Sequence, residues 1–146
     1  MKIAFLNMYN GYVDRGAETF VKEVAERLAL KHYVTVFQGG PQNGKEKYKV
    51  VSLGSIDWTR SDTSRTIWAY LLIDYWRRKI LEFSLRAAPI IIREKFDIVV
   101  PVNGSLMAGI MRFVTWLYGG KMVISGQSGI GFDDVINLLS FPDRFV

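Results

Sequence analysis

The sequence predicts an α/β protein with a doubly wound, Rossmann-like and mostly parallel sheet. Apolar runs of strand length alternate with segments of helical periodicity, and Gly, Pro, Asn and Asp residues separate them. The first strand, helix and second strand fit within roughly 35 residues, the size of a right-handed parallel βαβ unit. With 146 residues the chain has room for one domain. We therefore expect a single lobe spanning residues 1–146.

The first forty residues carry the clearest pattern. Ile3–Leu6 is a continuous apolar run, and Tyr33–Phe37 is a run rich in β-branched and aromatic residues, ended by Gly39 and Gly40. Between them lies an amphipathic helix. Its apolar face comprises Ala17, Phe20, Val21, Val24, Ala25, Leu28 and Ala29, and its solvent face Glu18, Lys22, Glu23, Glu26 and Arg27.

The later elements follow from the same runs and breakers, although the middle of the chain is less regular. A long helix is expected there, which Pro89 then breaks or restarts. Gly119 and Gly120 stop a second helix. The expected elements are a strand at Tyr48–Leu53, a helix at Thr66–Arg86, a strand at Phe96–Val100, a helix at Ser105–Tyr118, a strand at Met122–Ser125 and a short helix from Asp133.

Composition excludes several classes of protein. Hydrophobic residues make up 49% and charged residues 23%, which excludes a disordered chain. The absence of cysteine excludes a disulfide framework, a thiolate zinc site and a cysteine nucleophile, and it favours a cytoplasmic location. His32 is the single histidine, so a metal site would need carboxylates alone, and no suitable acidic cluster occurs. We expect no metal.

Charge and hydropathy narrow the partners. The net charge of +5 favours phosphate-bearing ligands, nucleic acid or anionic lipid. The longest stretch without a charged residue, Ile98 to Met111, is shorter than the roughly 20 residues of a membrane-spanning helix. The apolar run after Lys2 is too short for a signal peptide.

Ligands of a doubly wound sheet bind beyond the carboxyl ends of its strands, so the loops there are the candidate sites. They are Asn7 to Gly16, Pro101 to Ser105 and Gly126 to Asp134. The first leads into a helix N-terminus, whose free amides and dipole favour an anion such as a diphosphate, with Gly16 allowing close approach. The alternative is a simple connection with glycine at the helix entry.

The other loops leave alternatives open. The glycine spacing of the third loop is the reverse of the dinucleotide-binding pattern, so a nicotinamide site is not expected. Ser128 has no nearby histidine to activate it, so a serine nucleophile is not expected either. Asp133 either caps a helix or contacts a polar ligand. Asn103 either forms a hydrogen bond to a sugar hydroxyl or stabilises a turn. His32, between the first helix and the second strand, is expected to be a turn or cap residue at the opposite end of the sheet.

The middle helix suggests a second kind of partner. Basic residues outnumber acidic ones between Arg60 and Lys95, and aromatic residues are interleaved with them. This composition is typical of a helix at an anionic membrane surface, which Thr66–Arg86 would contact. The alternative is a helix buried on two sides or at a dimer contact. Nucleic-acid binding is not favoured, because the basic residues lie on an apolar helix rather than in an open groove.

Several short segments resemble the N-terminal half of a GT-B glycosyltransferase, most closely the retaining family 4 enzymes. Arg15 to Val21 is similar to the Gly-Gly-Ala-Glu-like element of that family, and Lys31 to Val36 is similar to its Gly-His-x-Val-Thr-Val element. The other similar segments are Met1 to Phe5, Phe96 to Val100, Gly119 to Val123 and Pro142 to Val146. Each is short, and the one around Gly16 is the most specific.

The resemblance implies a hexosyltransferase-type enzyme. A nucleotide-diphosphate sugar would be bound between two lobes, this one holding most of a saccharide or lipid-linked acceptor. No metal or cofactor beyond the sugar nucleotide is implied, because cationic groups and helix N-termini offset the diphosphate charge. The residues implied are Arg15, Gly16 and Ala17 for the donor phosphates, Tyr9, Asn10, Asn103, Ser128 and Asp133 for the acceptor, and Gln127 for catalysis.

Two departures from the family pattern qualify this expectation. Gln127 and Ser128 stand where many members have a histidine. The chain also lacks the donor-binding second lobe, so by itself it is expected to be inactive. The competing hypothesis is a non-catalytic α/β binding module or a peripheral membrane adaptor.

Overall fold

A computed structural model describes residues 1–54, 75–102 and 105–125. Its centre is a five-stranded sheet of order β3-β2-β1-β4-β5, in which every neighbouring pair is parallel. This arrangement confirms the predicted α/β class with a doubly wound, parallel sheet. The strands are β1 (Lys2–Asn7), β2 (Tyr33–Gln38), β3 (Lys49–Ser52), β4 (Ile98–Pro101) and β5 (Lys121–Met122).

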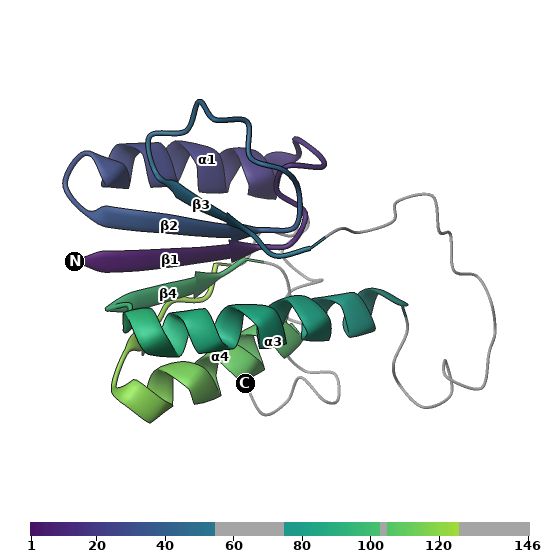
Figure 1. Ribbon diagram of the computed structural model, residues 1–146, viewed down its shortest axis with the longest axis vertical. Helices are drawn as coiled ribbons and strands as arrows, with labels where there is room; N and C mark the ends of the chain where they lie inside the picture. Colours follow the sequence, from purple (N-terminus) through teal and green to yellow (C-terminus); the bar gives the residue numbers. More distant parts are fainter. Residues whose placement is uncertain (55–74, 103–104, 126–146) are drawn as a thin grey trace.

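Helices cover both faces of the sheet (Figure 1). One face carries α1 (Gly16–Ala29), and the other carries α3 (Tyr75–Glu94) and α4 (Ser105–Tyr118). Because successive side chains of a strand point to opposite faces, β1 supplies both cores. Ile3 and Phe5 pack with the α1 layer, whereas Ala4 and Leu6 pack with the α3 and α4 layer.

The amphipathic pattern of α1 is confirmed for its apolar face. Val21 and Ala25 are fully buried against the sheet. The remaining apolar positions of the predicted face are partly buried and pack against the same core. The predicted solvent face is wrong at one residue, Glu18, which is buried.

The expected break at Pro89 does not occur, because α3 continues through it to Glu94. Proline lacks the N–H that would bond to the carbonyl of Leu85, one turn earlier. Both residues are exposed, so water can solvate that carbonyl. The helix stays in place through Phe83, Ala87 and Ile91, which are buried in the core beneath it.

The predicted strand positions are confirmed with shifted ends. β5 is the largest difference, since Met122–Ser125 was predicted and only Lys121–Met122 forms a strand. It pairs with β4 over Ile98 and Val99 alone. Val123 adds one backbone bond to the Val99 carbonyl, of length 3.0 Å.

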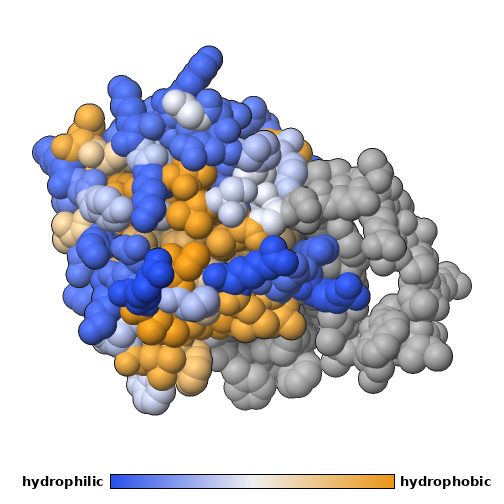
Figure 2. Space-filling model, in the orientation of Figure 1, coloured by the Kyte–Doolittle hydropathy of each residue, from blue (hydrophilic) through white to orange (hydrophobic). Residues whose placement is uncertain are grey.

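The two helical layers differ in polarity (Figure 2). Hydrophilic side chains gather over α1 and the adjoining loop, whereas apolar side chains occupy the centre and the lower part of this view, crossed by a row of hydrophilic side chains at the level of α3. Phe113, Trp116 and Leu117 of α4 are exposed. Among the residues that the structure describes, no helix combines the length and the apolar character needed to cross a membrane.

Candidate functional site

The connection from β1 to α1, residues 8–15, starts at a buried asparagine. The Asn7 side-chain amide donates to Oε1 of Glu18 over 3.2 Å, and its Oδ1 accepts from the Tyr9 N–H over 3.0 Å. One side chain thus links the end of β1, the loop and the first turn of α1. The buried Asn7 side chain therefore fixes the position of the loop relative to the helix start.

The carboxylate of Glu18 caps the first turn of α1. Glu18 Oε2 accepts the Arg15 N–H over 3.2 Å, so both Glu18 oxygens are engaged. The first helical backbone bond runs from the Thr19 N–H to the Arg15 carbonyl, over 2.9 Å. The amides of Gly16 and Ala17 precede it, in the part of a helix that has no intrahelical acceptor. Burial of Glu18 is explained by this capping role rather than by its place in the apolar pattern.

The structure separates the predicted residues of the first loop. Arg15 and Gly16 are exposed at the start of α1, and Ala17 packs partly against the core below. Tyr9 packs partly against the opposite core, beneath the sheet. Asn10 is buried, and its side-chain amide donates to Gln38 Oε1 over 2.6 Å.

The other predicted site residues cannot be placed beside this loop. Asn103, Gln127, Ser128 and Asp133 lie outside the described residues. The crevice expected among the three loops therefore stays a prediction. His32 does lie in the turn between α1 and β2, as expected, and its N–H donates to the Leu28 carbonyl over 2.9 Å.

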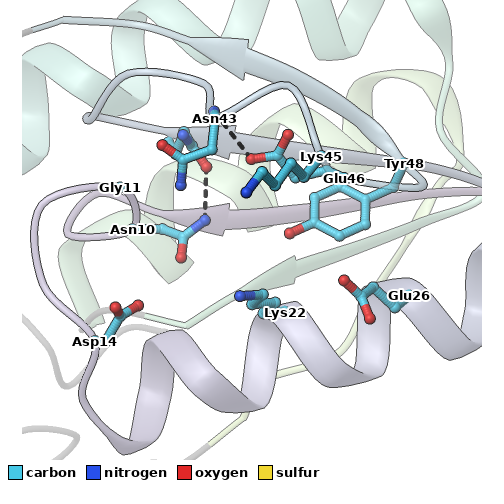
Figure 3. Close-up of a pocket in the computed structure, with 10 residues that line it drawn as sticks. Asn10, Gly11, Asp14, Lys22, Glu26, Asn43, Lys45, Glu46 and Tyr48 are labelled. Atoms are coloured by element: carbon cyan, nitrogen blue, oxygen red, sulfur yellow. Dashed lines mark hydrogen bonds between the residues drawn. The ribbon is translucent and has the colours of Figure 1, made fainter.

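A polar pocket of about 210 Å³ lies on the flank of α1 (Figure 3). Its walls are the β1–α1 loop, α1 itself and the loop that joins β2 to β3, residues 39–48. It is lined by Asn10, Gly11, Asp14, Lys22, Glu26, Gln38, Asn43, Lys45, Glu46 and Tyr48. Of the predicted site residues that the structure describes, Asn10 alone lines it.

Two glycines bring the loops into contact at one end of this pocket. The Gly40 N–H donates to the Asn10 carbonyl over 3.0 Å. A Cβ on Gly40 would overlap the backbone of Gly11, and Gly11 itself has a φ of +86°, which favours glycine. Gln38 adds to the junction by donating to the carbonyl of Pro41 over 2.8 Å. The end wall of the pocket is thus built by direct backbone packing.

The floor of the pocket is Tyr48, just before β3. Its ring is buried in the α1-side core, and the phenol points into the pocket between the loop and α1. Burial, followed by the negative charges of Glu46 and Glu26, raises the pKa of Tyr48 to about 12. At neutral pH this hydroxyl is therefore protonated and can donate a hydrogen bond.

Charged groups of both signs surround that hydroxyl. Glu46 Oε1 accepts the Asn43 N–H over 3.1 Å, whereas Glu46 Oε2 is buried without a partner among the described residues. Lys22 and Glu26 extend from α1 on the opposite side (Figure 3). Within residues 1–54, 75–102 and 105–125, no group of acidic or histidine side chains is arranged to hold a metal ion.

Sequence reasoning missed most of this pocket. Lys22 and Glu26 fit the solvent face of an amphipathic helix, and Tyr48 fits the apolar start of a strand. The available signal was the polar, glycine-containing stretch from Gly39 to Lys47, which joins two strands and has no helical period. In the structure this loop runs beside α1 and supplies one wall of the pocket.

No protein-family model matches the sequence, and no curated protein matches it significantly. Solved structures do match. Two crystal structures of the C-terminal domain of a hydrogenase from Pyrococcus furiosus are similar. One is 15% identical with a TM-score of 0.56, over 86% of this chain and 91% of that chain. The other is 15% identical with a TM-score of 0.55, over 85% and 90%. The fold is Rossmann-like.

A glycosyltransferase from Rickettsia africae also matches, with 19% identity and a TM-score of 0.49. The match covers 93% of this chain and 33% of that one. At such identities these likenesses concern the arrangement of strands and helices alone.

Proposed function

We propose that this chain is the acceptor-side lobe of a metal-independent glycosyltransferase. In this proposal Arg15, Gly16 and Ala17 receive the diphosphate of a sugar-nucleotide donor, and a second lobe supplies the remaining donor contacts. The chemistry is hexosyl transfer to a saccharide or lipid-linked acceptor. The observation that supports the proposal is that the described fold does not need a glycine at position 16.

Nothing within the described fold requires glycine at position 16. Its φ lies outside the left-handed region, and a Cβ built on it would meet no atom within 4 Å. Glycine inside a helix is less stable than alanine by up to about 1 kcal/mol. A glycine that neither backbone nor packing demands is expected where another molecule must approach the main chain closely.

The chemistry around Gly16 suits an anion. The helix N-terminus carries a partial positive charge, and Gly16 and Ala17 have amides in its first turn. Arg15 adds a guanidinium at the exposed edge. Both carboxylate oxygens of Glu18 are hydrogen-bonded within the fold, to the Asn7 side-chain amide and to the backbone N–H of Arg15. Offsetting a leaving diphosphate in this way needs no metal ion.

The proposal is tested by sugar transfer. The natural full-length protein is incubated with a panel of nucleotide-diphosphate sugars and saccharide acceptors, and release of the nucleotide diphosphate is measured. Gly16→Ala should keep the fold and lower kcat/KM for the donor by tenfold or more, because the methyl group obstructs the phosphate. Thr19→Ala, an exposed change in the same helical turn, is the matched control.

Two results would contradict the proposal. One is the absence of transfer with every donor under conditions in which the protein is folded. The other is an unchanged kcat/KM in Gly16→Ala, which would show that no ligand approaches this backbone.

A further inference from the structure

The pocket on the flank of α1 has a size and composition that point to one kind of occupant. Its volume of about 210 Å³ is below the roughly 300–1,000 Å³ of pockets for drug-sized ligands, so it suits one small ring. Every lining residue except Gly11 has a polar side chain. An occupant therefore has to be polar on all sides.

Tyr48 and Glu46 offer hydrogen-bonding groups to an occupant of the pocket. Tyr48 is only 8% exposed and its hydroxyl points into the pocket (Figure 3), whereas Glu46 Oε2 is buried and has no hydrogen-bond partner among the described residues. Buried polar groups are almost always hydrogen-bonded, because leaving one unpaired is unfavourable. Glu46 lines the pocket, so a hydrogen-bond donor of an occupant would satisfy this oxygen.

The charges select among possible occupants. Lys22 and Lys45 face the same space as Asp14, Glu26 and Glu46, yet none of them forms an ion pair within residues 1–54, 75–102 and 105–125. A phosphate would meet the three carboxylates, and a cationic amine would meet the two ammonium groups. Sugar hydroxyls both donate and accept, so they can match carboxylate, ammonium and amide groups in turn.

We propose that this pocket binds one ring of an uncharged saccharide. In this arrangement the Tyr48 hydroxyl donates to a ring substituent, Glu26 and Glu46 accept from sugar hydroxyls, and Lys22 and Lys45 donate to sugar oxygens. Asn10 and Gln38 close the inner end through their mutual hydrogen bond of 2.6 Å. The inference concerns binding alone and does not rest on sugar transfer.

Binding is measured by amide NMR on the isotope-labelled full chain. Glucose, galactose and N-acetylglucosamine are titrated separately to about 100 mM, which reaches weak millimolar sites. Glycine, lysine and inorganic phosphate serve as zwitterionic, cationic and anionic probes. At least one sugar should shift the amides of Asn10, Gly11 and Lys45 with a saturating curve.

Variants tie that binding to the pocket. Tyr48→Phe should weaken sugar binding about fivefold or more, because the sugar loses the hydrogen bond from the Tyr48 hydroxyl. Glu26→Gln should weaken it as well and gives a second measure if Tyr48→Phe folds poorly. Tyr33→Phe is the matched control, since Tyr33 is exposed and does not line the pocket, and it should change the affinity by less than twofold.

The inference is overturned if no sugar shifts these amides, if an amino acid or phosphate binds there instead, or if Tyr48→Phe binds sugar as the parent does. Its failure is distinct from failure of the proposed transferase. Sugar binding without transfer in any assay contradicts the transferase alone. Transfer without binding in this pocket contradicts the pocket alone.

Discussion

The two candidate sites beside α1 contrast sharply. At the start of the helix the buried charge is satisfied, because Glu18 accepts hydrogen bonds from Asn7 and Arg15, and the backbone at Gly16 is open. On the flank of the helix the backbone is tightly packed at Gly40, and Oε2 of Glu46 is buried without a partner among the described residues.

The difference shows two ways of leaving room for a ligand. The helix start offers main-chain amides beside the exposed side chain of Arg15, which suits a compact anion of fixed geometry. The flank pocket offers side chains of several kinds around a space, which suits a molecule with many hydroxyl groups. Substitutions in the two regions should therefore differ in the sign and size of their effects on stability.

The largest effect is expected at the glycine junction of the pocket. Gly40→Ala places a methyl group against the backbone of Gly11. Neither loop can move away without disturbing the hydrogen bond from the Gly40 N–H to the Asn10 carbonyl. We expect a loss of about 3 kcal/mol or more in the free energy of unfolding. Urea denaturation measures it. A loss below about 1 kcal/mol would show that the two loops are not in contact in solution.

The next effect belongs to the helix start. Glu18→Ala removes the acceptor of two hydrogen bonds and leaves the buried Asn7 amide unpaired. The expected loss is about 1–3 kcal/mol. Glu23→Ala on the same helix is the control, because Glu23 is exposed and only pairs with Arg27, and it should cost less than about 1 kcal/mol. Equal losses in the two variants would refute the capping role of Glu18.

A pH-dependent effect is expected in the pocket. The pKa of Tyr48 rises from 10.0 to about 12 on folding, so between these values the unfolded chain loses a proton that the folded chain keeps. Stability therefore falls with rising pH, by at most about 1.4 kcal/mol per pH unit from this residue. Below pH 10 the residue adds no pH dependence.

Tyr48→Phe should reduce this alkaline decline and leave stability at neutral pH nearly unchanged, since the lost hydroxyl had no partner among the described residues. Chemical denaturation at several pH values between 9 and 11 measures it. Tyr118, whose pKa is also raised by burial and by Asp97, will maintain part of the decline. If stability declines with pH in Tyr48→Phe as it does in the parent, the decline does not come from Tyr48. An equal reduction of the decline in Tyr33→Phe would contradict the assignment as well.

The smallest effect on stability is expected at Gly16. Gly16→Ala adds a methyl group in open space on a helix, so the free energy of unfolding should stay within about 0.5 kcal/mol or rise by up to about 1 kcal/mol. Thermal unfolding measures it next to Gly40→Ala. A clear loss would mean that glycine is needed by the fold itself, and the functional reading of this position would fail.

The fold was largely predictable because its signals are local. The apolar run Ile3–Leu6 and the spacing from Ala17 to Ala29 are periodic over enough residues to define β1 and α1. Pro89 was misjudged because the cost of proline in a helix depends on whether the freed carbonyl reaches water. That exposure is a property of the packed helix, and the sequence around Leu85 does not encode it locally.

The site was less predictable because it depends on contacts distant in sequence. Glu18 fits the solvent face of α1 by spacing, and only its distance from Asn7 makes it a buried cap. Tyr48 and Glu26 belong to different elements and meet because the loop over α1 brings them together. Gly16, by contrast, was identified from a local motif, and the structure adds that the fold itself does not require it.

The connection between β2 and β3 has a consequence for engineering. These parallel strands are joined by residues 39–48 without a helix, and the middle of that loop, from Gln42 to Lys47, makes no strand pairings. Exchanging this short stretch, while keeping Gly40 and Tyr48, should therefore retune what the molecule accepts beside α1 and leave the sheet intact. Selectivity and stability would then be adjustable independently.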